Sequence, residues 1–186
     1  MATSERGADR FLWIVIAVAA AAVIAVALSR SRRAPPEKPV PAAVSLPLLD
    51  GTGHASIGKG RVTVVDFWAT WCAPCRISMP RVQAIWREYR ARGVDLYSVD
   101  TDDPSAERET QVWSFLHSNG LTFPVVLDDG SAESAFAVSV LPTMVVVDRG
   151  GREVWRHIGL LNEAGEQELR TVLDSTLSGN VARSGG

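Results

Sequence analysis

The segment that most constrains the fold is Arg61 to Trp68, with the sequence RVTVVDFW. After Arg61, β-branched and aromatic side chains occupy both alternating sets of positions, so a strand here would be apolar on both faces. Such a strand is stable in the interior of a sheet that is covered on both sides. The segment therefore predicts a central strand with a layer packed against each of its faces.

Shorter patterns around this segment alternate between strand and helix. Apolar runs predict further strands over 44–49, 94–99, 125–127, 143–148 and 153–158. Helical patterns predict helices over 75–92, 105–119, 132–136 and 163–177. A short turn at 149–151 joins the last two strands into an expected hairpin. This order predicts an α/β sandwich with a mixed, mostly parallel sheet and a C-terminal antiparallel hairpin.

Residues 11–28 form an uncharged and continuously apolar run near the N-terminus. As a helix of about 18 residues it would span about 27 Å, close to the roughly 30 Å thickness of the hydrocarbon core of a membrane. Ala25-Val26-Ala27 resembles a signal-peptide cleavage site, whereas the length of the run favours an uncleaved segment. We expect a short tail at 1–10 and a transmembrane anchor or uncleaved signal at 11–28.

Basic residues flank this apolar run on both sides. Two arginines precede it, and the four basic residues that follow it are Arg30, Arg32, Arg33 and Lys38. Taken alone, the positive-inside rule would place the following domain in the cytoplasm. The proline-rich segment 29–43 predicts an extended linker, 44–178 a single folded domain, and 179–186 a flexible tail. The formal net charge of −2, without a basic stripe, makes nucleic acid an unexpected partner.

Both cysteines of the chain lie in WCAPCR, residues 71–76. A structural zinc site needs about four ligands, but the three histidines are scattered without ligand spacing. Attachment of a c-type haem would require a histidine at the position of Arg76. We therefore expect neither a metal nor a cofactor.

The spacing of Cys72 and Cys75 favours redox chemistry over a structural disulfide. A bridge across so short a loop would remove little entropy from the unfolded chain. Cys72 stands between a predicted strand and a helix, where free N–H groups and the helix dipole stabilise a thiolate. Pro74 is tolerated in the first helical turn. Cys75, one turn further along, is then placed to resolve a mixed disulfide.

Asp66 stands six residues before Cys72 among apolar neighbours on the predicted central strand. It is either an incidental polar residue at a strand end or a buried acid with a raised pKa. A carboxyl group of the second kind suits proton transfer with a thiol near neutral pH. We favour the second interpretation.

Several sequence blocks resemble a known family. VVDFWATWCAPCR, followed by Pro80, resembles the thioredoxin active-site segment. FPVVLDDG, LPTMVVVDRGGR and RHIGLL then follow in the order found in the membrane-anchored TlpA/ResA-like proteins. The resemblance covers about residues 44–178. It implies a thioredoxin-like three-layer α/β/α sandwich and a role for Asp66 as proton acceptor.

The same resemblance implies a substrate surface around Cys72. It places a cis peptide bond between Leu141 and Pro142, with the Leu141 backbone turned toward the cysteines to receive an extended substrate strand. Trp71 and Pro74 would complete this surface, although Trp71 alone could equally be a core residue. Many family members have a glutamate at the position of Ser78, so the acid–base task here falls more heavily on Asp66.

The resemblance further implies a membrane-tethered protein-disulfide reductase on the extracytoplasmic side of a bacterial cell membrane. Its substrates would be oxidised envelope proteins, with cytochrome c maturation as one candidate process, and a membrane partner would re-reduce it. We expect a monomer. The resemblance places the domain outside the cytoplasm, whereas the basic residues after 11–28 would place it inside. We follow the resemblance, because folded domains are translocated despite flanking charges. Ala73 and Pro74 supply no cation to stabilise a thiolate strongly, which favours a reductant over a strong oxidant.

Two alternatives share this fold. A peroxiredoxin-type thiol peroxidase would use a lone peroxidatic cysteine, usually without a second cysteine at C-x-x-C spacing. A non-enzymatic copper-binding assembly factor would space its cysteines one residue further apart and add a histidine ligand. Peroxide consumption and stoichiometric Cu(I) retention, respectively, would distinguish these alternatives from the disulfide reductase.

Overall fold

The computed structural model describes residues 38–39, 45–57 and 60–179. The chain divides into two units, 1–36 and 37–186, and all described residues belong to the second. The predicted tail at 1–10, the membrane segment at 11–28, most of the linker and residues 180–186 lie outside the described residues. Within the described ranges, no helix has the length and apolar character that crossing a membrane requires.

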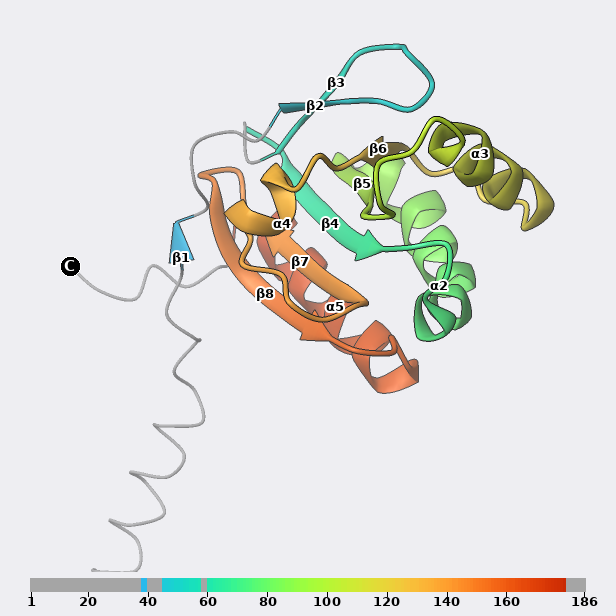
Figure 1. The fold of residues 1–186 in the computed structure, drawn as a ribbon. Helices are drawn as coiled ribbons and strands as arrows, with labels where there is room; N and C mark the ends of the chain where they lie inside the picture. Colours follow the sequence, from blue (N-terminus) through green and yellow to red (C-terminus); the bar gives the residue numbers. More distant parts are fainter. Residues whose placement is uncertain (1–37, 40–44, 58–59, 180–186) are drawn as a thin grey trace, which may run out of the picture. The chain divides into compact units, whose positions relative to one another are not determined.

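The central strand expected from RVTVVDFW is β4, Val62–Trp68, and all seven of its residues are buried. It pairs in parallel with β5, Val94–Asp100, on one side and antiparallel with β7, Thr143–Val147, on the other. The sequence pattern is thus confirmed at the middle of the sheet (Figure 1).

The remaining elements follow the expected alternation of strands and helices. The other strands are β1 (Lys38–Pro39), β2 (Ser45–Pro47), β3 (His54–Ser56), β6 (Val125–Leu127) and β8 (Arg152–Ile158). The helices are α2 (Ala73–Tyr89), the 3-10 turn η1 (Arg90–Arg92), α3 (Arg108–Ser118), α4 (Ser131–Ala135) and α5 (Glu163–Leu177). The sheet has the order β1-β8-β7-β4-β5-β6, and β2 pairs with β3 in a separate two-stranded sheet.

The sheet is mixed as expected, but the expectation of mostly parallel pairing is corrected. Only the β4–β5 and β5–β6 pairings are parallel among the described residues, whereas β4–β7, β7–β8 and β1–β8 are antiparallel. The reason is that the hairpin of β7 and β8 joins the central strand directly and is then extended by β1. The extended backbone that proline favours allows Pro39 to take part at this edge.

Two layers of side chains cover the sheet. One buried cluster joins β4 and its neighbours to α2, α3 and α5. A second cluster, on the opposite face, joins the sheet to α4 and the β2–β3 hairpin. Figure 1 shows α4 in front of the sheet and α5 behind it. The second covering layer of this thioredoxin-like sandwich therefore combines a short helix with a hairpin.

Candidate active site

The two cysteines lie where β4 gives way to α2. The Cys72 N–H donates to the Ala69 carbonyl at 3.1 Å, which closes the turn that leads into the helix. Cys72 is the N-cap of α2, and its sulfur accepts the Cys75 N–H at 3.2 Å. The two sulfur atoms form a disulfide, and Pro74 lies in the first turn, as expected. The helix start therefore directs an N–H donor at Cys72, the group that would carry a thiolate after reduction.

Asp66 is buried, with only 2% of its surface exposed. Alternation along β4 places it on the same face as Val64 and Trp68, which share a buried cluster with Cys75. Burial raises the pKa of Asp66 to about 7, while the hydroxyl of Ser98, which donates to Oδ2 at 3.3 Å, opposes the rise. The expected burial is confirmed, and the carboxyl group lies on the face of the sheet that packs against the cysteine helix.

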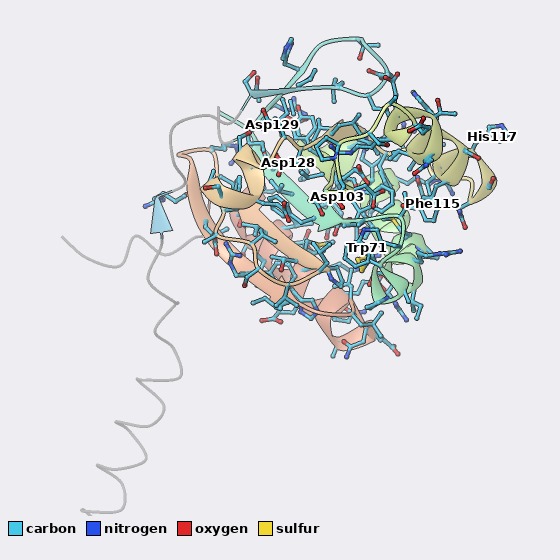
Figure 2. The ribbon with its side chains drawn as sticks, viewed as in Figure 1. Trp71, Asp103, Phe115, His117, Asp128 and Asp129 are labelled. Atoms are coloured by element: carbon cyan, nitrogen blue, oxygen red, sulfur yellow. A yellow bond between two sulfur atoms is a disulfide. The ribbon has the colours of Figure 1, made fainter. Side chains whose placement is uncertain are left out.

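A cavity of about 430 Å³ opens beside Cys72. Trp71, Pro74 and Leu141, which the resemblance placed at a substrate surface, are among the residues that line it. Trp71 is 70% exposed, so it forms a wall of the cavity and does not belong to the core. Figure 2 shows this side chain next to the N-terminal end of α2.

The peptide bond between Leu141 and Pro142 is cis, as the family resemblance implied. Leu141 lines the cavity, whereas Pro142 is buried behind it and is not among the described lining residues. The Pro142 carbonyl accepts the Gly159 N–H at 2.8 Å. Of the four residues that the resemblance placed at a substrate surface, Pro142 is therefore the one outside the described cavity lining.

Ser78 occupies the position at which many similar proteins have a glutamate, and it links two elements here. Its hydroxyl donates to the Pro74 carbonyl and accepts the Leu161 N–H, both at 3.0 Å. Leu161 precedes α5, so the hydroxyl joins the cysteine helix to the last helix of the fold. This residue has a structural role that its sequence context did not indicate.

Replacing Ser78 by alanine should lower the free energy of unfolding by about 1–3 kcal/mol, because the buried Leu161 N–H loses its acceptor. Chemical denaturation measures the effect. Ser178→Ala is a matched control, because the exposed Ser178 hydroxyl only donates to the Asp174 carbonyl one turn earlier. Its cost should stay within about 0.5 kcal/mol. Equal losses in the two variants would contradict the role of Ser78.

Residues 101–102, which follow β5, form hydrogen bonds with the turn that precedes Cys72. The sequence interpretation missed this feature. Both carboxylate oxygens of Asp102 accept the Thr70 N–H, at 3.2 and 3.1 Å. The Thr101 N–H donates to the Trp68 carbonyl at 2.8 Å. These contacts hold the residues immediately before Cys72 in position. The available signal was an acidic residue shortly after the strand predicted at 94–99.

A buried ion pair anchors the same segment from the other side. Arg108, the first residue of α3, donates from Nε to Asp100 Oδ1 at 2.8 Å and from Nη1 to the Asp128 carbonyl at 2.7 Å. Burial raises the pKa of Asp100 to about 7 against the opposing effect of Arg108, and the neighbouring Asp102 raises it further. Asp128 in turn caps α4, accepting the Ala132 N–H at 2.9 Å, and lies close to that helix in Figure 2.

Metal-binding side chains do not gather elsewhere in the described part of the chain. Over 38–39, 45–57 and 60–179, no group of three or more histidine, cysteine, aspartate or glutamate side chains is arranged to hold a metal ion.

Solved structures with the same fold match most of this chain. StoA from Bacillus subtilis superposes with a TM-score of 0.62 at 27% identity, covering 72% of this chain and 98% of that chain. A DsbF homologue from Corynebacterium diphtheriae has a TM-score of 0.60 at 25% identity, covering 75% and 87%. Fold and site together define a thioredoxin-like protein with a C-x-x-C disulfide at the start of a helix.

A family model described as Redoxin matches residues 35–173. The chain belongs to the Redoxin family. It is 30% identical over 116 residues to the thiol-disulfide oxidoreductase ResA of Halalkalibacterium halodurans, covering 62% of this chain and 64% of that relative. It is 34% identical over 102 residues to ResA of Bacillus thuringiensis, covering 54% and 57%. The chain thus spans less than two thirds of these relatives, and the expected TlpA/ResA resemblance is confirmed.

Proposed function

We propose that this protein is a thiol–disulfide oxidoreductase that reduces disulfides of other proteins. The observation that carries the proposal is the Cys72–Cys75 disulfide at the start of α2, on the sheet face that also holds the buried acid Asp66. The names of the ResA relatives support the same chemistry.

The proposed reaction is dithiol–disulfide exchange starting from reduced protein. The Cys72 thiolate attacks one sulfur of the substrate disulfide, forming a mixed disulfide and releasing the other substrate sulfur as a thiolate. The Cys75 thiolate then attacks Cys72, so the substrate leaves with two reduced sulfurs and Cys72–Cys75 is oxidised. Asp66 accepts the Cys75 proton, for which a pKa of about 7 is suitable near neutral pH. A reductant that supplies two electrons regenerates the dithiol.

We further propose that the protein works from a membrane tether on the extracytoplasmic side of a bacterial cell membrane. The support is the apolar run at 11–28 together with the TlpA/ResA resemblance. A membrane partner would supply the electrons, and oxidised envelope proteins, including those of cytochrome c maturation, would be the substrates. Cleavage of the domain by added protease in spheroplasts tests the orientation, and protection from protease would contradict it.

The two alternatives make different demands on the cysteines. A thiol peroxidase would consume peroxide stoichiometrically through one cysteine, whereas here both cysteines of the chain are joined to each other. A copper-binding factor would retain Cu(I) through a histidine as well as cysteines. Peroxide consumption and Cu(I) retention by the reduced protein measure these activities directly.

The deciding experiment is to replace Cys75 by serine and trap the substrate on Cys72 in cells. Without Cys75 the mixed disulfide is not resolved, so higher-mass adducts should accumulate on non-reducing gels and disappear with a reductant. Mass spectrometry of the adducts identifies the substrates. Cys72→Ser is the matched control and should form far fewer adducts. Equal trapping by both variants, or none by Cys75→Ser, would contradict the proposed mechanism.

A further inference from the structure

The cavity beside Cys72 has one charged residue among its described lining residues. That residue is Glu133, in the first turn of α4, while the other described lining residues are uncharged. The cavity therefore combines a nearly neutral surface next to the reactive sulfur with a single negative group.

Among the described residues, no cation lies within ion-pair distance of the Glu133 carboxylate. Its backbone N–H donates to Asp128 Oδ2 at 2.9 Å, but within the described ranges its carboxylate has neither a hydrogen bond nor an ion pair. Burial raises the pKa of Glu133, the nearby Asp128 raises it further, and Arg108 lowers it. Arg108 is itself bound to Asp100 and the Asp128 carbonyl. A half-buried carboxylate in this situation is stabilised by an added cation.

Exposed apolar side chains line the same cavity. Trp71 is 70% exposed and Val140 52% exposed, although both are large apolar residues. Exposed apolar surface next to a polar group is typical of a site that binds another protein. An indole face also attracts cations and packs against the methylene chain of a lysine or arginine.

We propose that this cavity receives an extended segment of the oxidised substrate that carries a lysine or arginine beside the reactive cysteine. The cation pairs with Glu133, and its methylene chain packs against Trp71. This inference rests on the proposed disulfide reductase function and adds a preference for basic substrate segments. A peptide is the expected occupant because the cavity beside Cys72 joins exposed apolar side chains to one negative group.

The test compares two disulfide-bonded peptides that differ at one position beside a cysteine, lysine in one and glutamate in the other. The ratio of their kcat/KM values for reduction by the full-length protein should favour lysine by about five- to tenfold, the range of a partly buried ion pair. Glu133→Gln should bring the ratio close to that of the peptides' intrinsic reactivities, and Glu133→Lys should invert it. Added salt should reduce the preference of the wild-type protein.

The matched control is Asp129→Asn, which removes an exposed acid just before α4 whose carboxylate accepts the Ser131 N–H. It should keep the wild-type ratio. Because each ratio is taken within one protein, differences in the amount of active protein cancel. A ratio unchanged by Glu133→Gln would overturn the inference while leaving the reductase function intact. Failure of the wild-type protein to reduce either peptide or a small-molecule disulfide would overturn both.

Discussion

Replacing Asp66 by asparagine should stabilise the folded protein by about 4 kcal/mol at pH 8 and by almost nothing at pH 4. Burial raises the pKa of Asp66 from 3.8 to about 7. Each pKa unit corresponds to about 1.4 kcal/mol. Keeping this carboxylate ionised and buried above pH 7 therefore costs about 4 kcal/mol for the rise of about three units. An asparagine of nearly the same shape carries no charge and avoids the cost.

The sign of the pH dependence follows from proton binding. In the unfolded chain Asp66 ionises near pH 4, whereas in the folded protein it stays protonated until about pH 7. The folded state therefore binds more protons between these values, and wild-type stability should fall as the pH rises from 4 to 7. Asp100 contributes in the same direction because burial also raises its pKa to about 7. Asp66→Asn should remove only the part of this fall in stability that Asp66 causes, and the part caused by Asp100 should remain.

Denaturant unfolding of the oxidised protein at pH 4, 6 and 8 measures this difference. Asp103→Asn is a suitable control, because Asp103 is exposed and should change stability by no more than about 0.5 kcal/mol at any of these pH values. Equal stabilities of wild type and Asp66→Asn at pH 8 would contradict the buried, raised-pKa carboxyl.

The same substitution also tests the proposed catalytic role. Without the Asp66 carboxylate, Cys75 has to lose its proton to solvent, and general-base catalysis typically contributes about a hundredfold or more. Disulfide reduction at pH 7 should therefore slow by about two orders of magnitude in Asp66→Asn, and the pH profile should lose its inflection near pH 7. A more stable variant with unchanged rate would leave Asp66 without a catalytic role.

Replacing Arg108 by methionine should lower the free energy of unfolding by about 3–5 kcal/mol at pH 8. Arg108 and Asp100 are both buried, and removing one partner leaves an uncompensated charge inside the protein. Lowering the pH should reduce the loss, because Asp100 can then take up a proton and become neutral. Denaturant unfolding at pH 5 and pH 8 measures both the size of the loss and its pH dependence.

Two further variants sharpen this prediction. Arg61→Met breaks the more exposed ion pair between Arg61 and Asp95 and should cost about 1 kcal/mol or less. Adding Asp100→Asn to Arg108→Met should restore part of the stability, because the buried charge is then removed together with its partner. A loss in Arg108→Met no greater than in Arg61→Met would contradict a structural role for the buried pair.

Elements with strong local patterns were predictable from the sequence. The fully apolar run RVTVVDFW forms the buried strand β4, and the expected segments 125–127 and 163–177 coincide with β6 and α5. Elements without a distinct local pattern were not predictable. β3, His54–Ser56, has only three residues within a glycine-rich stretch, too few for a periodic signal. β1 consists of two linker residues that pair with β8 only because the folded domain offers an edge.

The start of α3 shows why one buried ion-pair network was missed. An arginine at the first position of a helix is unfavourable with respect to the helix dipole, so no local rule indicates Arg108 as a structural residue. Its value comes from Asp100 and Asp128, which the fold brings to the same place. In the same way, the hydroxyl of Ser78 gains its role only because Leu161 packs against α2.

By itself the sequence determined the central strand, the Cys72–Cys75 pair at a helix start and a buried Asp66, because each depends on spacing within a few neighbouring residues. Only the tertiary structure decided which distant groups meet. Asp66 meets Ser98, and Thr70 meets Asp102, each across 32 positions of the chain. Side-chain periodicity specifies the face on which a residue lies, but sheet register and helix packing select its neighbour on that face.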